Sequence, residues 1–583
     1  MCGVAGGWWR ASLSNRVRKG NRRNGRRNAG AGHGTLDQSL RVNAHLENRM
    51  TGKSAAWGMR GMAVAPHSLA AESAIGVLRE GGNALEAMVA AAACIAVVYP
   101  HMNSIGGDAF WLIHVPGETP RGIDACGAAG ANVTCDLYRE RRLDRIPFRG
   151  GMAANTVAGT LSGWSLALDY SKDMLGGRLP LARLLADAIH YARHGIPVTR
   201  SQHDTTKAKV DGLLEQPGFA ETFLHDGDVP RIGAPFYQPR LAATLQQLAT
   251  AGLDDFYRGD LARSIVRDLA ACGSSVTAED LRNHRAGWRK PLSIGHSLGT
   301  LYNLPPPTQG AISLMVLGIL DRLEIGRTQP DSADYVHLCI EAVKQAFGVR
   351  DRYITDPAYM TQDAQDLLSP ACIDALAARV DRTRAAPWGA GQVPADTVWM
   401  GVIDGAGRAV SFIQSLYHEY GSGIVLRETG INWQNRGCSF SLDERALNAL
   451  RPGRKPFHTL NPALALLGDG TVMVYGNMGG DGQPQTQSAV FTRCAIFGMD
   501  PRAAIAAPRW LLGRTWGQTS DTLKLEPRFD PAVVAELRAR GHDVELLAPY
   551  DEALGHAGAI LRDANGVLQG GSDPRSDGGV AAW

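Results

Sequence analysis

A threonine at the start of the last third of the chain has the surroundings of a nucleophile. Thr397 follows Ala395 and Asp396 and begins a strand-like run of residues. A threonine hydroxyl needs a base. If the peptide bond before Thr397 is broken, the new α-amino group, with an ordinary pKa of about 7.7–8.0, becomes that base. Considered alone, a threonine in this position is more simply explained as a β-forming residue.

A glycine-containing turn near the C-terminal end could supply hydrogen-bond donors to such a reaction. The stretch Gly476-Asn477-Met478-Gly479-Gly480 lies between a predicted strand, 471–475, and a predicted helix that starts near Gln485. Glycines at the end of a strand can direct backbone N–H groups toward a developing negative charge. An ordinary turn at the end of a strand is the alternative.

A second motif points to different chemistry, but its surroundings do not fit. Residues Gly295 to Gly299 match G-x-S-x-G, the nucleophile elbow, which requires a helix directly after the serine. Residues 300–304 are β-like, and Pro305 to Pro307 prevent a helix soon afterwards. We therefore predict a β-turn at this motif. The sequence contains no H-E-x-x-H, P-loop or complete G-x-G-x-x-G, so metalloprotease, NTPase and dinucleotide-binding functions have no support.

The elements before Thr397 are predicted to be mainly helical. Ordered sequence is expected to begin near Gly61, with a strand over 62–65 and a helix that ends at Leu78. A nearly all-apolar helix over 84–99 must be buried. Residues 155–290 are rich in amphipathic helical patterns, and two more helices are predicted over 310–323 and 332–351.

The chain changes character around Thr397. Residues 384–396 are rich in Pro, Gly and Ala, and this composition predicts a linker. Two hairpins are predicted behind it, one pairing 398–404 with 408–414 and one pairing 463–467 with 471–475. This layout predicts a core of sheets and helices in which the junction before Thr397 could be cut.

The composition is that of a soluble globular protein with a basic N-terminal tail. Of the 583 residues, 44% are hydrophobic and 20% charged. Eight Arg and Lys residues and no acid lie between Met1 and Leu36, so the net charge of +3 leaves 3 − 8 = −5 for the rest. The tail could be a nucleic-acid-binding arm or an import peptide. We expect instead that residues 1–58 are a disordered extension, or that translation starts at Met50 or Met59.

The cysteines and apolar segments indicate the compartment. The nine cysteines are scattered and include no C-x-x-C, which argues against a disulfide framework and against structural zinc. No secretory h-region follows the basic residues, and the apolar run 89–98 is too short to span a bilayer. We expect a cytoplasmic enzyme without a metal or cofactor, which binds neither nucleic acid nor membrane.

The chain resembles the gamma-glutamyltransferases, a family of N-terminal nucleophile hydrolases, over about residues 59–583. Short motifs in a family-like order carry the resemblance. They are residues 62–84 with Gly81-Gly82-Asn83-Ala84, Ser104-Ile105-Gly106-Gly107, Pro305-Pro306-Pro307, Asp351-Arg352-Tyr353 with Asp356-Pro357, Asp396-Thr397, Gly421-Ser422-Gly423-Ile424 and Gly479-Gly480.

The resemblance implies an α/β (α+β) fold, a four-layer αββα sandwich that is made as one chain and cuts itself between Asp396 and Thr397. Residues 59–396 would form the large subunit and 397–583 the small subunit, and a homodimer of the processed unit is left open. Thr397 would form an acyl-enzyme on an amide carbonyl. Ser415 stands where the family has a threonine that hydrogen-bonds the nucleophile, and Gly479 and Gly480 would form the oxyanion hole.

The chain departs from the family pattern where the family binds the glutamyl group. Cys126 replaces the arginine that holds the α-carboxylate, and Ser439 replaces an acid that pairs with the α-amino group. Arg436 replaces a glutamine, and His458-Thr459 replaces a pair of serines. Charged hydrogen bonds contribute about 1.5–3 kcal/mol each, so these losses place γ-glutamyl specificity in doubt.

Arg436 and His458 instead suggest a site for a single carboxylate, without an ammonium site opposite. Residues 458–462 and 479–484 resemble the oxamate amidohydrolases of purine breakdown, a hydrolytic branch of the family. We therefore predict a small-molecule amidase that converts oxamate to oxalate and ammonia. A glutathione hydrolase or γ-glutamyltransferase is the alternative, and a non-catalytic protein that binds nucleic acid through its tail is a third. Arg436 paired with a surface acid and His458 as an ordinary core histidine would be the purely structural explanation.

Overall fold

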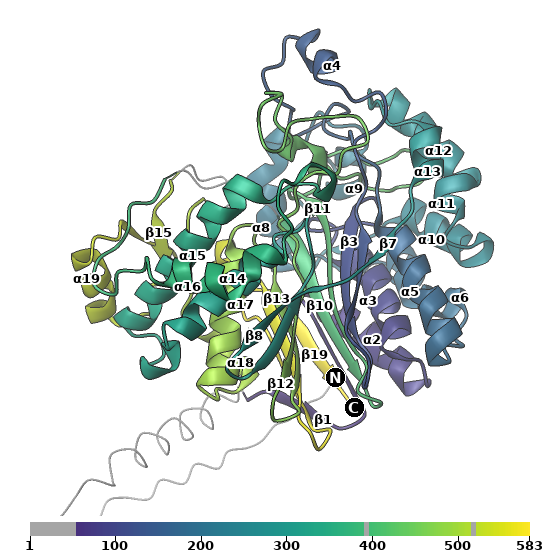
Figure 1. Ribbon diagram of the computed structural model, residues 1–583. Helices are drawn as coiled ribbons and strands as arrows, with labels where there is room; N and C mark the ends of the chain where they lie inside the picture. Colours follow the sequence, from purple (N-terminus) through teal and green to yellow (C-terminus); the bar gives the residue numbers. More distant parts are fainter. Residues whose placement is uncertain (1–53, 390–395, 515–519) are drawn as a thin grey trace, which may run out of the picture. The chain divides into compact units, whose positions relative to one another are not determined.

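The computed structural model describes residues 54–389, 396–514 and 520–583. The predicted N-terminal extension up to residue 53, and linker residues 390–395, lie outside the described residues. Two seven-stranded sheets pack face to face, and helices cover both outer faces, with α2, α3 and α5 on one side and α14 to α17 on the other (Figure 1). The predicted four-layer αββα arrangement is confirmed.

The first sheet carries Thr397 in its middle. Every neighbouring pair of its strands is antiparallel. In spatial order the strands are β19 (Gly579–Ala582), β2 (Gly61–Ala65), β10 (Asp396–Asp404), β11 (Ala409–Tyr417), β3 (Asp108–His114), β4 (Arg121–Ala125) and β7 (Gly287–Arg289).

The second sheet is also antiparallel and begins with a strand that the sequence analysis did not predict. Its order is β1 (Ala56–Gly58), β18 (Leu568–Ser572), β17 (Ala557–Arg562), β13 (Val472–Asn477), β12 (Ala463–Leu467), β9 (Gly299–Asn303) and β8 (Leu292–His296). Trp57 of β1 pairs with Gln569, so the chain enters the sheet before residue 59. Three residues at a sheet edge carry too little apolar pattern to be recognised in a sequence.

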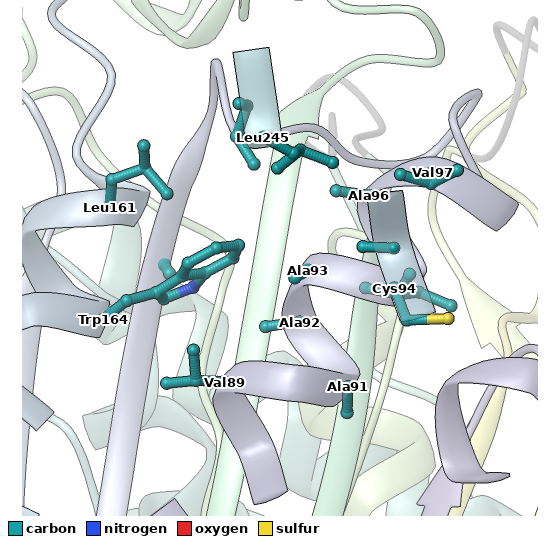
Figure 2. Packing of buried hydrophobic residues seen from close by; sticks show 14 of the residues in the cluster. Val89, Ala91, Ala92, Ala93, Cys94, Ala96, Val97, Leu161, Trp164 and Leu245 are labelled. Atoms are coloured by element: carbon teal, nitrogen blue, oxygen red, sulfur yellow. The ribbon is translucent and has the colours of Figure 1, made fainter. Parts of the chain in front are cut away.

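A helical layer built around α3 (Ala84–Val98) covers the outer face of the first sheet. All residues of α3 are buried, as predicted, and Asn83 and Glu86 form a capping box at its start. Figure 2 shows Trp164 beside this alanine-rich helix, whose small side chains allow close packing. The other large helices of this layer are α2 (Ser68–Arg79), α5 (Thr160–Leu175), α7 (Ala186–His194), α10 (Pro239–Ala251) and α12 (Asp260–Ala271).

The outer face of the second sheet is covered by helices from both halves of the chain. They are α14 (Gly310–Arg322), α15 (Ala333–Tyr353), α16 (Pro370–Ala377), α17 (Gly482–Phe491), α18 (Pro501–Ala506) and α19 (Pro531–Ala539). The helix predicted from Gln485 starts earlier, at Gly482, and changes at Thr492 to a π-helix that ends at Ile496.

Shorter elements connect these layers. They are α4 (Cys135–Arg139), α6 (Leu181–Leu184), α8 (Arg200–Lys209), α9 (Phe219–Phe223), α11 (Asp255–Arg258), α13 (Ala278–Asn283), the pair β5 (Ile196–Pro197) and β6 (Pro235–Phe236), and the small sheet of β14 (Trp510–Leu512), β15 (Leu523–Leu525) and β16 (Val544–Leu546).

The predicted hairpins are confirmed, including the turn at the G-x-S-x-G motif. Strands β8 and β9 pair directly on either side of Ser297 and Leu298, so no helix follows the serine. The Ser297 hydroxyl donates a hydrogen bond to Asp321 over 2.6 Å. This serine is part of a turn and not a nucleophile elbow.

Trp399 of β10 fixes how the two sheets face each other. Its indole N–H donates to the Ser411 hydroxyl over 3.0 Å, and its ring lies between the sheets. A Cβ atom added at Gly476 of β13 would lie 2.3 Å from this ring, and one added at Gly558 of β17 would also lie at 2.3 Å. Glycine is therefore required at both positions, because the indole occupies the space of a side chain.

We predict that Gly558→Ala destabilises the fold, since the new methyl group collides with the Trp399 ring. Overpacking of this kind costs about 1–3 kcal/mol, and a lower midpoint of urea unfolding would measure it. Gly295→Ala in β8 is the matched control, because a Cβ atom there meets no atom within 4 Å. Equal midpoints for the two variants would contradict the proposed role of Trp399.

Candidate active site

Strand pairing brings Thr397, Ser415 and Asp108 into line across the first sheet. Ser415 of β11 pairs with Asp108 of β3. On the other side of β11, Val398 of β10 pairs with Gln414. The next residue of each strand therefore places Thr397 opposite Ser415. The register shifts at this point, so Thr397 faces a bulge in β11. The structure thus brings together the predicted nucleophile and its predicted hydrogen-bonding neighbour.

Cys126 extends the line at its far end. Ala109 pairs with Ala125, so the next residues, Asp108 and Cys126, lie side by side. We call Thr397, Ser415, Asp108 and Cys126 the transverse row. Side chains directly opposite each other in a sheet point to the same face.

The transverse row lies at one end of the space between the two sheets. Two residues further along β10, β11 and β3 are Trp399, Ile413 and Phe110. All three belong to the apolar core between the sheets. Because side chains alternate along a strand, the row points into the same space. Thr397 is almost fully buried, with 1% of its surface exposed.

The predicted oxyanion turn lies at the same end of the second sheet. Gly401 packs against Val474, and Trp399 packs against Gly476, so β10 and β13 run past each other. If both strands are followed two residues further, Thr397 of β10 comes to lie beside the turn that follows Asn477 of β13.

Gly479 and Gly480 both have positive φ angles. Their φ angles are +120° and +52°, in the range that favours glycine. Among the residues that the structure describes, no acceptor receives a hydrogen bond from either N–H. Both groups are therefore available to stabilise a negative oxygen.

Gln309, at the start of α14, holds this turn beside the segment that contains Thr459. Its side-chain N–H₂ group donates to the carbonyl of Thr459 over 2.8 Å and to the carbonyl of Gly480 over 2.9 Å. Gln309 was not predicted from the sequence. Its position after the proline run and before a buried helix was the available signal.

Arg436 is a buried cation without a polar partner in the described structure. Its side chain is 1% exposed, and its guanidinium lies 3.9 Å above the ring centroid of Tyr417. Neither Nη1 nor Nη2 has a hydrogen-bond partner among the described residues. Burial lowers the pKa of Arg436 to about 10, so the group stays charged at neutral pH. Pairing with a surface acid is thereby excluded, and the unpaired N–H groups call for an anionic ligand.

Asp108 lies beside this cation, which the sequence analysis did not foresee. Its Oδ1 atom accepts hydrogen bonds from the backbone of Gly127 (3.0 Å) and Gly159 (3.1 Å) and from the side chain of Gln434 (3.2 Å). Its Oδ2 atom has no hydrogen-bond partner among the described residues. Burial raises the pKa of Asp108 to about 7, although Arg436 and these donors oppose the shift. Asp108 therefore places an acidic group near Arg436, where the sequence suggested a carboxylate site without an ammonium site opposite.

His458 and Thr459 present further unpaired polar atoms. Both ring nitrogens of His458 and the hydroxyl of Thr459 lack hydrogen-bond partners within the described residues. The His458 Nε2 atom lies 3.6 Å from the Asp108 Oδ2 atom, and the ring packs edge-on against Phe110. Burial holds the pKa of His458 well below its usual range, so the ring is neutral. His458 is not the satisfied core histidine of the structural explanation.

Cys126 and Ser439 differ in how free they are to bind a ligand. The Cys126 thiol donates to Asp124 over 3.1 Å, and this carboxylate also binds Lys455 and Arg289. Burial raises the pKa of Cys126 well above its usual range, so the thiol is neutral. The Ser439 hydroxyl, by contrast, has no partner in the described part of the chain.

A separate cluster with metal-binding residue types lies away from this site. His337, Glu341 and His542 place their ligand atoms within 4.8 Å of one another. The two histidines hydrogen-bond each other over 2.8 Å, and Glu341 accepts from Lys344 over 2.7 Å. His337 also bonds the Asp381 carbonyl, so these groups already have partners and anchor the segment before the linker.

The chain is similar to known enzymes over most of its length. A model of the gamma-glutamyltranspeptidase family matches residues 70–583. The oxamate amidohydrolase proenzyme of Klebsiella pneumoniae is 58% identical over 523 residues, covering 90% of this chain and 98% of that protein. The glutathione hydrolase-like YwrD proenzyme of Bacillus subtilis is 41% identical, with 89% of this chain and 98% of that protein covered.

A solved structure agrees with these similarities. The crystal structure of cephalosporin acylase from Bacillus halodurans superimposes with a TM-score of 0.83 at 34% identity and covers 91% of this chain and 97% of that one. Within the described residues, no helix combines the length and apolar character needed to cross a membrane.

We predict that Gln309→Leu lowers the free energy of unfolding by about 1–3 kcal/mol, because two buried carbonyl groups lose their donor. Urea unfolding measures this change. Gln246→Leu, at an exposed position of α10, is the matched control and should change stability much less. Indistinguishable unfolding of the two variants would show that Gln309 does not hold the turn.

Proposed function

Because the chain belongs to the gamma-glutamyltranspeptidase family of N-terminal nucleophile hydrolases, we propose that it cuts itself before Thr397 and then hydrolyses a small carboxylated amide. The family relatives named as proenzymes support the cut. The position of Thr397 in the transverse row, next to Ser415 and directly after the linker, supports this residue as the new N-terminus.

The proposed chemistry follows from the groups at the site. The free α-amino group of Thr397 takes the proton of its own hydroxyl, and Oγ adds to the amide carbonyl. The N–H groups of Gly479 and Gly480 stabilise the negative oxygen that forms. The amide nitrogen leaves with the proton that the amine held, and water then hydrolyses the ester and frees Thr397.

The unpaired, buried guanidinium of Arg436 is the observation that carries the substrate proposal. A cation so deeply buried is costly unless an anion binds to it. The ring of Tyr417, in the strand that also contains Ser415, positions it, so a bound carboxylate lies close to the reacting carbonyl. A short acid amide satisfies both requirements. Oxamate, which carries its carboxylate on the carbon next to the amide, is our leading substrate, in keeping with the name of the Klebsiella relative.

A γ-glutamyl compound is the second candidate, and one observation favours it. Asp108 supplies an anion beside the Arg436 cation, and two such charges could hold the zwitterion of an amino acid. Ammonia release from oxamate, compared with turnover of a γ-glutamyl anilide by the same preparation, separates the two. Strong anilide turnover without ammonia from oxamate would overturn the first proposal.

We predict that Thr397→Ala abolishes processing, because the nucleophile for the cut is lost. A denaturing gel should show two pieces for the wild type, the smaller one with 583 − 396 = 187 residues, and one intact chain for the variant. Thr397→Ser keeps a hydroxyl and should still be cut. Two pieces from Thr397→Ala would exclude Thr397 as the nucleophile.

We further predict that Arg436→Met reduces kcat/KM for oxamate by at least about tenfold, since a charged hydrogen bond contributes about 1.5–3 kcal/mol. The same variant should be at least as stable as the wild type, because it removes a buried charge whose Nη1 and Nη2 atoms have no hydrogen-bond partner among the described residues, and Asp108, whose pKa burial raises to about 7, can then take up a proton. Steady-state kinetics and urea unfolding measure the two effects. Arg451→Met, at an exposed position nearby in the sequence, is the matched control and should leave both unchanged. A wild-type value of kcat/KM in Arg436→Met would show that Arg436 does not bind the substrate carboxylate.

A further inference from the structure

Asp108 places a negative charge in the ligand site that the proposed mechanism does not use. The titratable groups that face it come from four parts of the chain. They are Arg436 in the 3-10 helix over Arg436–Ser439, His458, Cys126 after β4, and Tyr257 of α11.

Of these groups, only Arg436 is charged at neutral pH. Burial lowers the pKa of His458 and raises the pKa of Cys126 and of Tyr257, so all three are neutral. Above pH 7, where Asp108 is mainly ionised, its charge balances that of Arg436, and these five groups together carry no net charge.

A carboxylate ligand changes this balance. It adds a second negative charge around one guanidinium, among side chains that are almost fully buried. Two carboxylates that share one buried cation cannot both stay ionised at low cost, so one of them gains a proton.

The geometry of Asp108 shows where the proton goes. Oδ1 is occupied by three N–H donors, whereas Oδ2 has no partner among the described residues. A proton on Oδ2 turns an acceptor into a donor that points toward the space between Asp108 and His458, whose facing atoms are 3.6 Å apart. The protonated group can then donate to the ligand carboxylate or to the neutral imidazole.

We propose that Asp108 is a substrate-recognition residue that takes up one proton from solvent on Oδ2 when a carboxylate ligand binds to Arg436. The inference rests on the proposed carboxylate role of Arg436. If a proton neutralises Asp108, the ligand does not need an ammonium group to do so. The site would therefore select an anion that carries no ammonium group.

The pH dependence has a definite sign. Burial raises the pKa of Asp108 to about 7 in the free enzyme. Below this pH the acid is already protonated, and binding needs no further proton. Above it, the affinity for a carboxylate falls about tenfold per pH unit, because each binding event must add a proton.

Calorimetry of the processed enzyme tests the proposal with pyruvate, which has the shape of oxamate with a methyl group in place of the amino group. Titrations at pH 8 in two buffers of different ionisation enthalpy give the number of protons bound. We expect close to one proton per site for the wild type. Asp108→Asn keeps the Oδ1 acceptor, so it should bind pyruvate with no proton uptake and with an affinity independent of pH.

Asp169→Asn, which removes an exposed acid of α5, is the matched control and should behave as the wild type. Equal proton uptake in Asp108→Asn and the wild type would overturn the proposal, as would a wild type that binds pyruvate without proton uptake or does not bind it. Preferential binding of an amino acid, without proton uptake and lost in Asp108→Asn, would show instead that Asp108 pairs with an ammonium group.

The wild-type proton count does not depend on whether the variant folds. The calorimetry also tests the role of Asp108 independently of whether oxamate is the substrate. Proton uptake with pyruvate, but no ammonia from oxamate, would support the role of Asp108 and reject oxamate.

Discussion

The packing of the Trp399 ring between the two sheets is the constraint on which the site depends. The ring fills the space above glycines in two strands of the second sheet and thereby fixes how β10 runs past β13. Thr397 lies two residues before the tryptophan, and the glycine turn follows the strand that the ring touches. The proposed nucleophile and the proposed oxyanion donors come from different sheets, and only the relative position of the sheets brings them together.

The site gathers buried polar groups that the fold does not satisfy. Arg436, Asp108 and His458 each keep at least one polar atom without a hydrogen-bond partner among the described residues, while the His337–His542 cluster elsewhere is internally paired. Unpaired buried polar groups lower stability, so a cation, an acid and a neutral imidazole that meet without hydrogen-bond partners are atoms that a bound ligand could satisfy. The unpaired donors on Arg436 and the unpaired acceptor on Asp108 indicate which charges and hydrogen-bonding groups a complementary ligand would carry.

The strand order explains how a chain cut before Thr397 would stay together. In the first sheet, β10 and β11 of the C-terminal piece lie between β2 and β3 of the N-terminal piece. In the second sheet, four strands of the C-terminal piece are flanked by β1 on one edge and by β9 and β8 on the other. Separating the pieces would break hydrogen-bonded ladders in both sheets, so the cut frees an amino group without dissolving the fold.

The sequence by itself determined the local elements, including the buried helix α3, the hairpins around Thr397 and the turn at Ser297, because their patterns extend over neighbouring residues. The glycine turn was a candidate from its local pattern, and the resemblance to a family added Ser415 and Arg436. Only the tertiary structure revealed Asp108 and Gln309 and showed that Arg436 is unpaired. Asp108 meets Ser415 through strand register across some 300 residues of chain. No local pattern encodes such a register, since it follows from how whole sheets pack.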